Sequence, residues 1–177
     1  GGQTLGAYRP NSTPEGSSAG SAVATALGLA VAAIGTEATT FSSIPGPAEF
    51  AIVLGMKPSR GLIANDGAIP ISGRQDVIGP TTKTARDAAY MLSRMAGRSE
   101  KDDWTWSILF DSIPDVTTFC KGTDLTGITV GVPRNTFSAD PTSSIMVSFE
   151  AAIETLRRAG QRWWIMLTFQ KPKGSRN

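Results

Sequence analysis

Apolar residues recur along the chain with spacings that predict both helices and strands. Alanine, valine and leucine dominate residues 21–33 and favour a helix without a polar face. Residues 51–56 (AIVLGM) form a short apolar run between turn signals, which is typical of a buried strand. The intervening residues 34–47 are rich in turn-forming types and predict a link between these two elements.

Two later segments carry apolar residues on one helical face. Residues 84–96 predict a helix in which Thr84 and Asp87 resemble a capping box. Residues 140–160 predict another helix, which begins after an Asp-Pro pair and ends at a glycine. Residues 128–132 lie between them and have the pattern of a strand. Helices that alternate with short buried strands predict an α/β fold.

Composition and charge narrow the class of protein. With 40% hydrophobic and 18% charged residues, the chain is typical of a folded domain. The net charge of +2 comes from the end of the chain, because residues 161–177 carry four basic and no acidic side chains. The remaining residues are slightly acidic, which speaks against a nucleic-acid partner. Residues 22–34 are the longest apolar run and are too short for a membrane span. The single cysteine, Cys120, excludes an intrachain disulfide and favours a reducing compartment such as the cytoplasm.

The stretch GSSAGS, residues 16–21, is the first candidate for chemistry. Around Ser18 it matches the G-x-S-x-G pattern of a nucleophile elbow. The chain has no histidine, which excludes a Ser-His-Asp triad and any zinc site that needs histidine. A nucleophilic serine would need a lysine, a carboxylate or another hydroxyl as its base. The alternatives are serines that cap a helix, and a helix start whose N–H groups bind a small anion or carbonyl.

Several blocks in a fixed order resemble the amidase signature family, including its fungal-type amidases. Residues 1–80 contain the blocks GGQTLGAY, NSTP, GSSAGSAVA, GTE, SIPGPAEFAIVLGMKPSRG and ISGRQDVIGP, and a looser likeness continues to residue 160. The resemblance implies an α/β fold with a mixed sheet core flanked by helices, present here as an incomplete fragment. Residues 1–160 would be a partial amidase signature domain. Residues 161–177 show no family pattern and are expected to be a disordered or undocked tail.

The same resemblance implies an amidohydrolase with a Ser-Ser-Lys triad and no cofactor, whose partner is a small-molecule amide substrate. Ser43 matches the nucleophile that forms the acyl-enzyme, with Ser42 as the alternative. Ser17 matches the serine that relays the proton, and the resemblance implies a cis peptide bond between Gly16 and Ser17. Neither the particular amide nor the oligomeric state follows from the sequence.

Two departures from the family pattern predict that this chain is inactive by itself. Two extra residues place Thr40, Phe41 and Ser42 where backbone N–H groups of the family form the oxyanion hole. The family's catalytic lysine precedes both serines, whereas the first lysine here is Lys57, which matches a later block. A serine without a base loses much of its catalytic power. The alternative interpretation is a non-catalytic remnant, or a module that binds a small anion or carbonyl.

Overall fold

The computed structural model describes residues 2–38, 43–110, 112–132, 134, 140, 142–160 and 162–164, the last three by their backbone alone. The chain divides into two compact units, Gly1–Lys121 and Gly122–Asn177. The first unit contains α1 (Ala19–Ala26), β1 (Ala32–Glu37), α2 (Pro45–Phe50), β2 (Leu54–Gly55), β3 (Val77–Thr82), α3 (Ala85–Met95) and the 3-10 helices η1 (Asp103–Ser107) and η2 (Val116–Phe119). None of the helices in the described ranges is long and apolar enough to cross a membrane.

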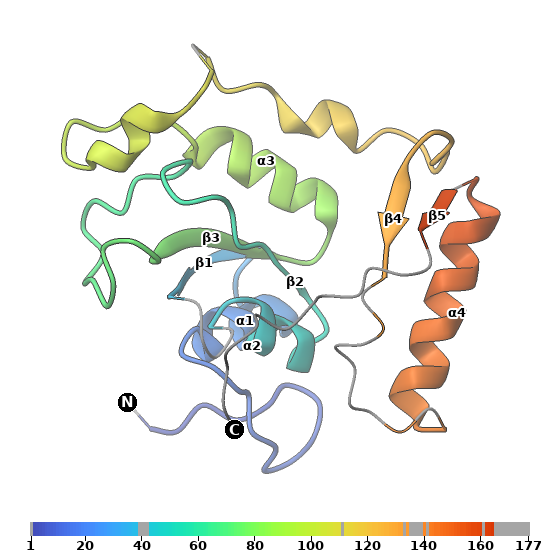
Figure 1. The fold of residues 1–177 in the computed structure, drawn as a ribbon. Helices are drawn as coiled ribbons and strands as arrows, with labels where there is room; N and C mark the ends of the chain where they lie inside the picture. Colours follow the sequence, from blue (N-terminus) through green and yellow to red (C-terminus); the bar gives the residue numbers. More distant parts are fainter. Residues whose placement is uncertain are drawn as a thin grey trace, which may run out of the picture. The chain divides into compact units, whose positions relative to one another are not determined.

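A three-stranded sheet forms the centre of the first unit. Its strands follow the order β1-β3-β2, and both pairings are antiparallel. Helix α3 covers one face of this sheet, while α1 and α2 cover the other (Figure 1). The first unit therefore has a helix–sheet–helix layering, in which each helix buries an apolar side against the sheet.

Ile44 is the central side chain of the layer that contains α1 and α2. It is 1% exposed and packs against two glycines, Gly35 and Gly79, which face each other across β1 and β3. A Cβ atom added at Gly35 would lie 2.9 Å from Ile44 Cγ1 and 2.9 Å from Ser18 Oγ. Glycine at this position thus allows the helical layer to approach the sheet closely.

The helix predicted over residues 84–96 is confirmed as α3. Thr84 Oγ1 accepts a hydrogen bond from the Asp87 backbone N–H at 3.1 Å, and the Thr84 hydroxyl donates to Asp87 Oδ2 at 2.7 Å. These bonds satisfy a donor in the first turn that the helix itself leaves unpaired. Ala88 and Ala89 are buried, as the apolar face of this helix requires.

The other predictions for the first unit are partly wrong. The helix expected over residues 21–33 ends at Ala26, and the chain then turns at Gly28, where φ is +73°. Residues 32–37, predicted as the end of this helix and the start of the link 34–47, form β1 instead, because a long-range pairing with β3 satisfies their backbone. Only two residues of the strand expected over 51–56 form β2, and the segment before it folds as α2 with prolines in its first turn. Pro80 and a glycine lie within β3, so its sequence gives a weak strand signal.

The second unit contains β4 (Thr129–Gly131), α4 (Ser144–Arg158) and β5 (Arg162–Trp164). The strand and the helix predicted in this part of the chain are confirmed. Strand β4 pairs in parallel with β5, which belongs to the segment 161–177. For the three residues of β5 this pairing departs from the expectation of an undocked tail, because their backbone groups find partners in β4. The rest of that segment lies outside the described residues, and the expectation for it stays a prediction.

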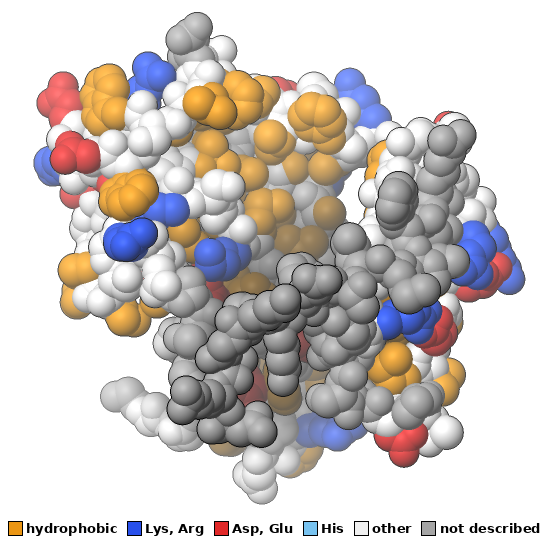
Figure 2. All heavy atoms as spheres, in the orientation of Figure 1, with side chains coloured by type: hydrophobic (Ala, Val, Ile, Leu, Met, Phe, Trp, Pro, Cys, Tyr) orange, Lys and Arg blue, Asp and Glu red, His pale blue; other side chains and the backbone are white. Residues whose placement is uncertain are grey.

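Hydrophobic side chains gather on one part of the surface. Figure 2 shows them in the upper middle of the face drawn there, with Lys, Arg and acidic side chains mostly around its edges. Leu109 is 95% exposed, and Tyr90 and Trp106 are each more than half exposed. Apolar side chains make up much of the surface of ordinary folded domains, so their exposure does not by itself mark a binding site.

Candidate active site

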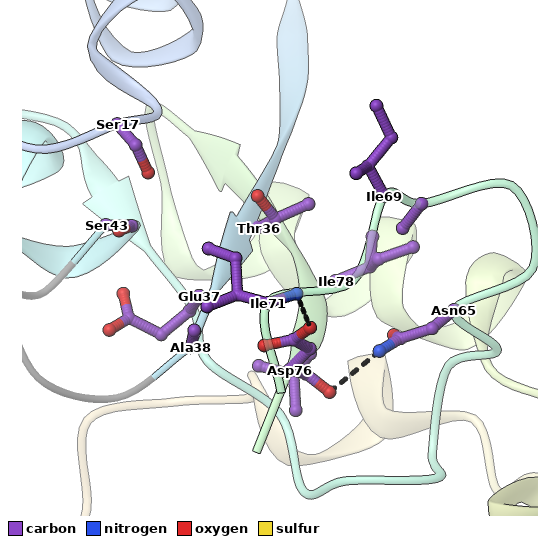
Figure 3. A pocket seen from close by; sticks show the side chains of 12 residues that line it. Ser17, Thr36, Glu37, Ala38, Ser43, Asn65, Ile69, Ile71, Asp76 and Ile78 are labelled. Carbon is purple, nitrogen blue, oxygen red and sulfur yellow. Dashed lines mark hydrogen bonds between the residues drawn. The ribbon is translucent and has the colours of Figure 1, made fainter. Parts of the chain in front are cut away.

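Ser17 and Ser43 line one cleft of the first unit (Figure 3). The residues around it come from the start of α1, the end of β1, the start of α2 and the segment that leads into β3. Its polar lining consists of Ser17, Thr36, Glu37, Ser43, Asn65 and Asp76. Its apolar lining consists of Ala38, Ala68, Ile69, Ile71, Val77 and Ile78. The two serines selected from the sequence are therefore brought together by the fold.

A tight turn before α1 presents Ser17 at this cleft. Glu15 and Gly16 both have left-handed backbone conformations, with φ of 51° and 53°. Helix α1 starts two residues after Ser17, and the Ser18 N–H donates to the Ser43 carbonyl oxygen at 3.1 Å. This hydrogen bond joins the two serine-bearing segments directly.

The peptide bond between Gly16 and Ser17 is trans, since the described residues contain no cis peptide bond. The cis bond implied by the family resemblance is therefore wrong for this structure. The left-handed pair Glu15–Gly16 makes the turn that brings Ser17 to the cleft with a trans bond. A cis bond before a residue other than proline would cost about 3 kcal/mol.

Ser18 has a structural position. It is 9% exposed and stands at the N-cap position of α1, yet its side chain makes no capping bond. Its Oγ accepts from the Thr36 N–H at 3.1 Å and lies 3.3 Å from the Thr36 carbonyl oxygen, to which it donates. Ser18 thus ties α1 to β1, and the nucleophile-elbow interpretation centred on it gains no support. Ser21 makes a similar tie, donating from Oγ to the Ile34 carbonyl oxygen at 2.7 Å.

A buried carboxylate holds the backbone next to Ser43. Glu37, at the end of β1, is 3% exposed, and its Oε2 accepts from the Ile44 N–H at 2.6 Å. Together with the packing of Ile44 on the sheet, this bond fixes the position of Ser43, which is half-buried. Glu37 was not selected from the sequence, and its place in the GTE block is the signal that could have indicated it.

Asp76 and Asn65 build the opposite wall of the cleft. Asp76 is 8% exposed, and its Oδ2 accepts from the N–H groups of Ile71 at 2.7 Å and Ser72 at 2.9 Å. Asn65 Nδ2 donates to the Asp76 carbonyl oxygen at 2.8 Å. Asp76 Oδ1 and Asn65 Oδ1 are buried without a hydrogen-bond partner in the described parts of the chain. The sequence interpretation missed this wall, although its residues lie in or near the block ISGRQDVIGP.

An ion pair supports this wall from behind. Arg60 Nη1 lies 2.9 Å from Asp102 Oδ2, and the same oxygen accepts from the Asn65 N–H at 2.9 Å. The hydrogen bond from Arg60 is the largest of several effects that hold the pKa of Asp102 below its ordinary value. The guanidinium carbon of Arg60 also lies 5.4 Å from the centre of a Trp104 ring, within the range of a cation–π contact.

Other residues of interest lie outside this cleft or outside the described ranges. Thr40, Phe41 and Ser42, which were expected to form the oxyanion hole, are not among the described residues. No lysine is among the described residues that line the cleft. The described parts of the chain contain no cluster of three or more metal-ligating side chains. The catalytic roles assigned to Ser17 and Ser43 remain predictions.

The fold and the cleft lined by two serines describe an α/β protein with a candidate serine site. Comparison with known proteins identifies its family. The family model described as Amidase matches residues 1–173. The chain belongs to the amidase family, whose signature enzymes the sequence blocks resemble. The match runs beyond residue 160, where the likeness was expected to end, and so includes most of the segment 161–177.

Individual relatives agree with this assignment. The native peptide amidase from Stenotrophomonas maltophilia has 40% sequence identity and a TM-score of 0.83, over 92% of this chain and 33% of that one. A relative from Arthroderma benhamiae, whose own assignment as an amidase is provisional, is 42% identical over 90% of this chain and 27% of its own length. A glutamyl-tRNA(Gln) amidotransferase subunit from Thermotoga maritima is 35% identical over 84% of this chain and 30% of its length. The chain thus spans about a third of the length of its relatives.

Proposed function

We propose that this chain carries the serine part of an amide-hydrolysing site, in which Ser43 is the nucleophile and Ser17 the proton relay. The observation that carries this proposal is that both serines line one cleft, joined by the hydrogen bond from the Ser18 N–H to the Ser43 carbonyl. Membership of the amidase family supports a substrate with a carboxamide group. The peptide amidase relative suggests the carboxamide of a peptide as one candidate.

The reaction would run through an acyl-enzyme. The Ser43 Oγ would attack the carbonyl carbon of the amide while its proton passes to the Ser17 Oγ and the proton of Ser17 passes to a base. The base would then return a proton, through Ser17, to the leaving nitrogen. The C–N bond breaks and releases ammonia or an amine, and water hydrolyses the ester on Ser43 to release the carboxylic acid. Each step needs a group that accepts and returns a proton. The family resemblance implies that a lysine, the third member of the Ser-Ser-Lys triad, is this group.

We further propose that the 177-residue chain by itself does not hydrolyse amides. Its first lysine is Lys57, and no residue before Ser17 can act as the expected lysine base. General-base assistance contributes roughly 100-fold to 10,000-fold to the rate of such reactions. The alternative function is that of a binding module. It would bind a carbonyl or small anion in the same cleft and would not hydrolyse an amide.

The decisive experiment compares two forms of the protein. In the first, the purified chain and its Ser43→Ala variant are incubated with a peptide amide, and ammonia release is measured. We expect equal rates for both, and a turnover that Ser43→Ala abolishes would contradict the proposed inactivity. In the second, a segment with a lysine at the position that the family resemblance implies is joined before Gly1.

The extended form tests the assignment of the serines. A fluorophosphonate probe should label Ser43 in it, and peptide mapping identifies the labelled residue. Ser17→Ala should slow this labelling at least tenfold, because it removes the proton relay, whereas Ser59→Ala, at an exposed site, serves as the matched control. A label on Ser42 or Ser18 would contradict the assignment of the nucleophile. Absence of any label, with carboxamide binding retained, would favour the binding module.

A further inference from the structure

We propose that Ile69 and Ile71 form an apolar contact surface for the substituent of the bound amide, and that Asp76 is the positioning residue that holds this surface in place. The inference rests on the proposed function, because it assigns a substrate class to the same cleft. That class is carboxamides whose carboxamide group is attached to an apolar chain or ring.

Ile69 and Ile71 are exposed although they line the cleft. Ile69 is 93% exposed and Ile71 is 82% exposed, and both contribute to the lining that includes Ser17 and Ser43. Figure 3 shows the Ile71 side chain directed toward the side of the cleft on which the two serines lie. Apolar side chains at the mouth of a cleft with a few polar groups inside are typical of small-molecule sites.

The size of the cleft determines which part of a substrate it can hold. Its cavity volume is about 20 Å³, which corresponds to one or two water-sized groups. The interior therefore has room for the polar end of a carboxamide group, such as its oxygen, and the substituent has to lie at the mouth. The substituent there meets Ile69 and Ile71, and it would bury their exposed surface.

The segment that carries the two isoleucines is held by several hydrogen bonds around Asp76. Asp76 Oδ2 accepts from the N–H groups of Ile71 and Ser72. In turn, the Ser72 carbonyl oxygen accepts from the N–H groups of Gln75 at 3.1 Å and Asp76 at 3.0 Å. Asn65 anchors the same residue through the Asp76 carbonyl. A contact surface whose backbone is fixed beforehand loses little entropy when a ligand binds.

The test measures binding of acetamide, butyramide and hexanamide to the 177-residue chain by NMR titration. Affinity should rise about fourfold for each added methylene group that reaches the isoleucines. In the double variant Ile69→Ser/Ile71→Ser this rise with chain length should vanish. Val31→Ser is the matched control, because Val31 is also 93% exposed and is not part of the cleft lining. It should keep the full rise.

Two variants test Asp76 separately. Asp76→Ala should flatten the dependence on chain length and speed hydrogen exchange at the N–H groups of Ile71 and Ser72, whose acceptor it removes. Asp76→Asn should restore both properties, because its amide oxygen can still accept from these groups. Unchanged chain-length dependence and exchange in Asp76→Ala would overturn the positioning role.

The outcomes separate this inference from the proposed function. A chain-length dependence that persists in Ile69→Ser/Ile71→Ser, or no binding of hexanamide at all, overturns the inference. These readouts do not require hydrolysis, so failed labelling of Ser43 together with an intact chain-length dependence counts against the proposed function alone.

Discussion

The backbone N–H of Ser18 donates a hydrogen bond to the carbonyl oxygen of Ser43 over 3.1 Å. This bond joins the start of α1 to the residue before Ile44, and thereby brings Ser17 and Ser43 to one cleft. On either side of it, Ser18 Oγ is bonded to the backbone of Thr36 and Glu37 binds the Ile44 N–H. The spacing of the two serines is therefore determined by neighbouring residues that take no part in the proposed chemistry.

Replacing Ser18 by alanine should destabilise the first unit. The substitution removes a buried hydroxyl that bonds both the N–H and the carbonyl of Thr36 and leaves these groups without that partner. We expect the free energy of unfolding in urea to fall by about 1–3 kcal/mol. Ser59→Ala, at an exposed position, should change it by less than about 0.5 kcal/mol. Equal stability of the two variants would show that the link between α1 and β1 is not important.

Replacing Gly35 by alanine should destabilise the same contact by overpacking. The added methyl group would lie 2.9 Å from both Ile44 Cγ1 and Ser18 Oγ. Inserting a methyl group into a packed interior typically costs about 1–3 kcal/mol. Gly73→Ala is the matched control, because an added Cβ there meets no atom within 4 Å. Thermal unfolding followed by circular dichroism should show a lower midpoint for Gly35→Ala alone, and a shared midpoint would contradict the packing argument.

The ion pair between Arg60 and Asp102 should make stability depend on pH in the acid range. The folded state holds the pKa of Asp102 below its ordinary value, so the ionised carboxylate stabilises the fold. This stabilisation is largest at pH values where Asp102 is ionised in the folded and in the unfolded chain. That contribution is fully present above the unfolded pKa, near about pH 4, and is lost as pH falls through the folded pKa. Urea unfolding from pH 7 to pH 2.5 should show this loss, and Asp102→Asn should reduce it.

Arg60→Met provides the corresponding test from the other side of the pair. It removes the largest cause of the lowered pKa of Asp102 and should weaken the acid-range dependence in the same way. It also leaves a buried carboxylate without its cation, which should cost about 3–5 kcal/mol at neutral pH. If the unfolding free energy of Asp102→Asn varies with pH as steeply as that of the unaltered chain, the pair does not control acid stability.

The sequence by itself determined the family, the α/β class and the elements whose signals are local. The capping residues Thr84 and Asp87 belong to the first turn of α3, so neighbouring residues alone specify where this helix begins. The strand β4 and the helix α4 were predicted for the same reason. The ordered sequence blocks selected Ser17 and Ser43, and the fold places both at one cleft.

Only the tertiary structure decided how the cleft is built. Residues 32–37 join the end of the predicted helix to the start of the predicted link, yet they form a strand because β3, far along the chain, supplies their hydrogen-bond partners. Asp102 supports the wall by accepting a hydrogen bond from the Asn65 N–H, and it is itself paired with Arg60, a residue 42 positions earlier. Asp76 acts through backbone N–H groups, which every residue type except proline carries and which leave no mark in a sequence. Contacts of this kind depend on which segments meet in space, and a local pattern of residue types does not contain that information.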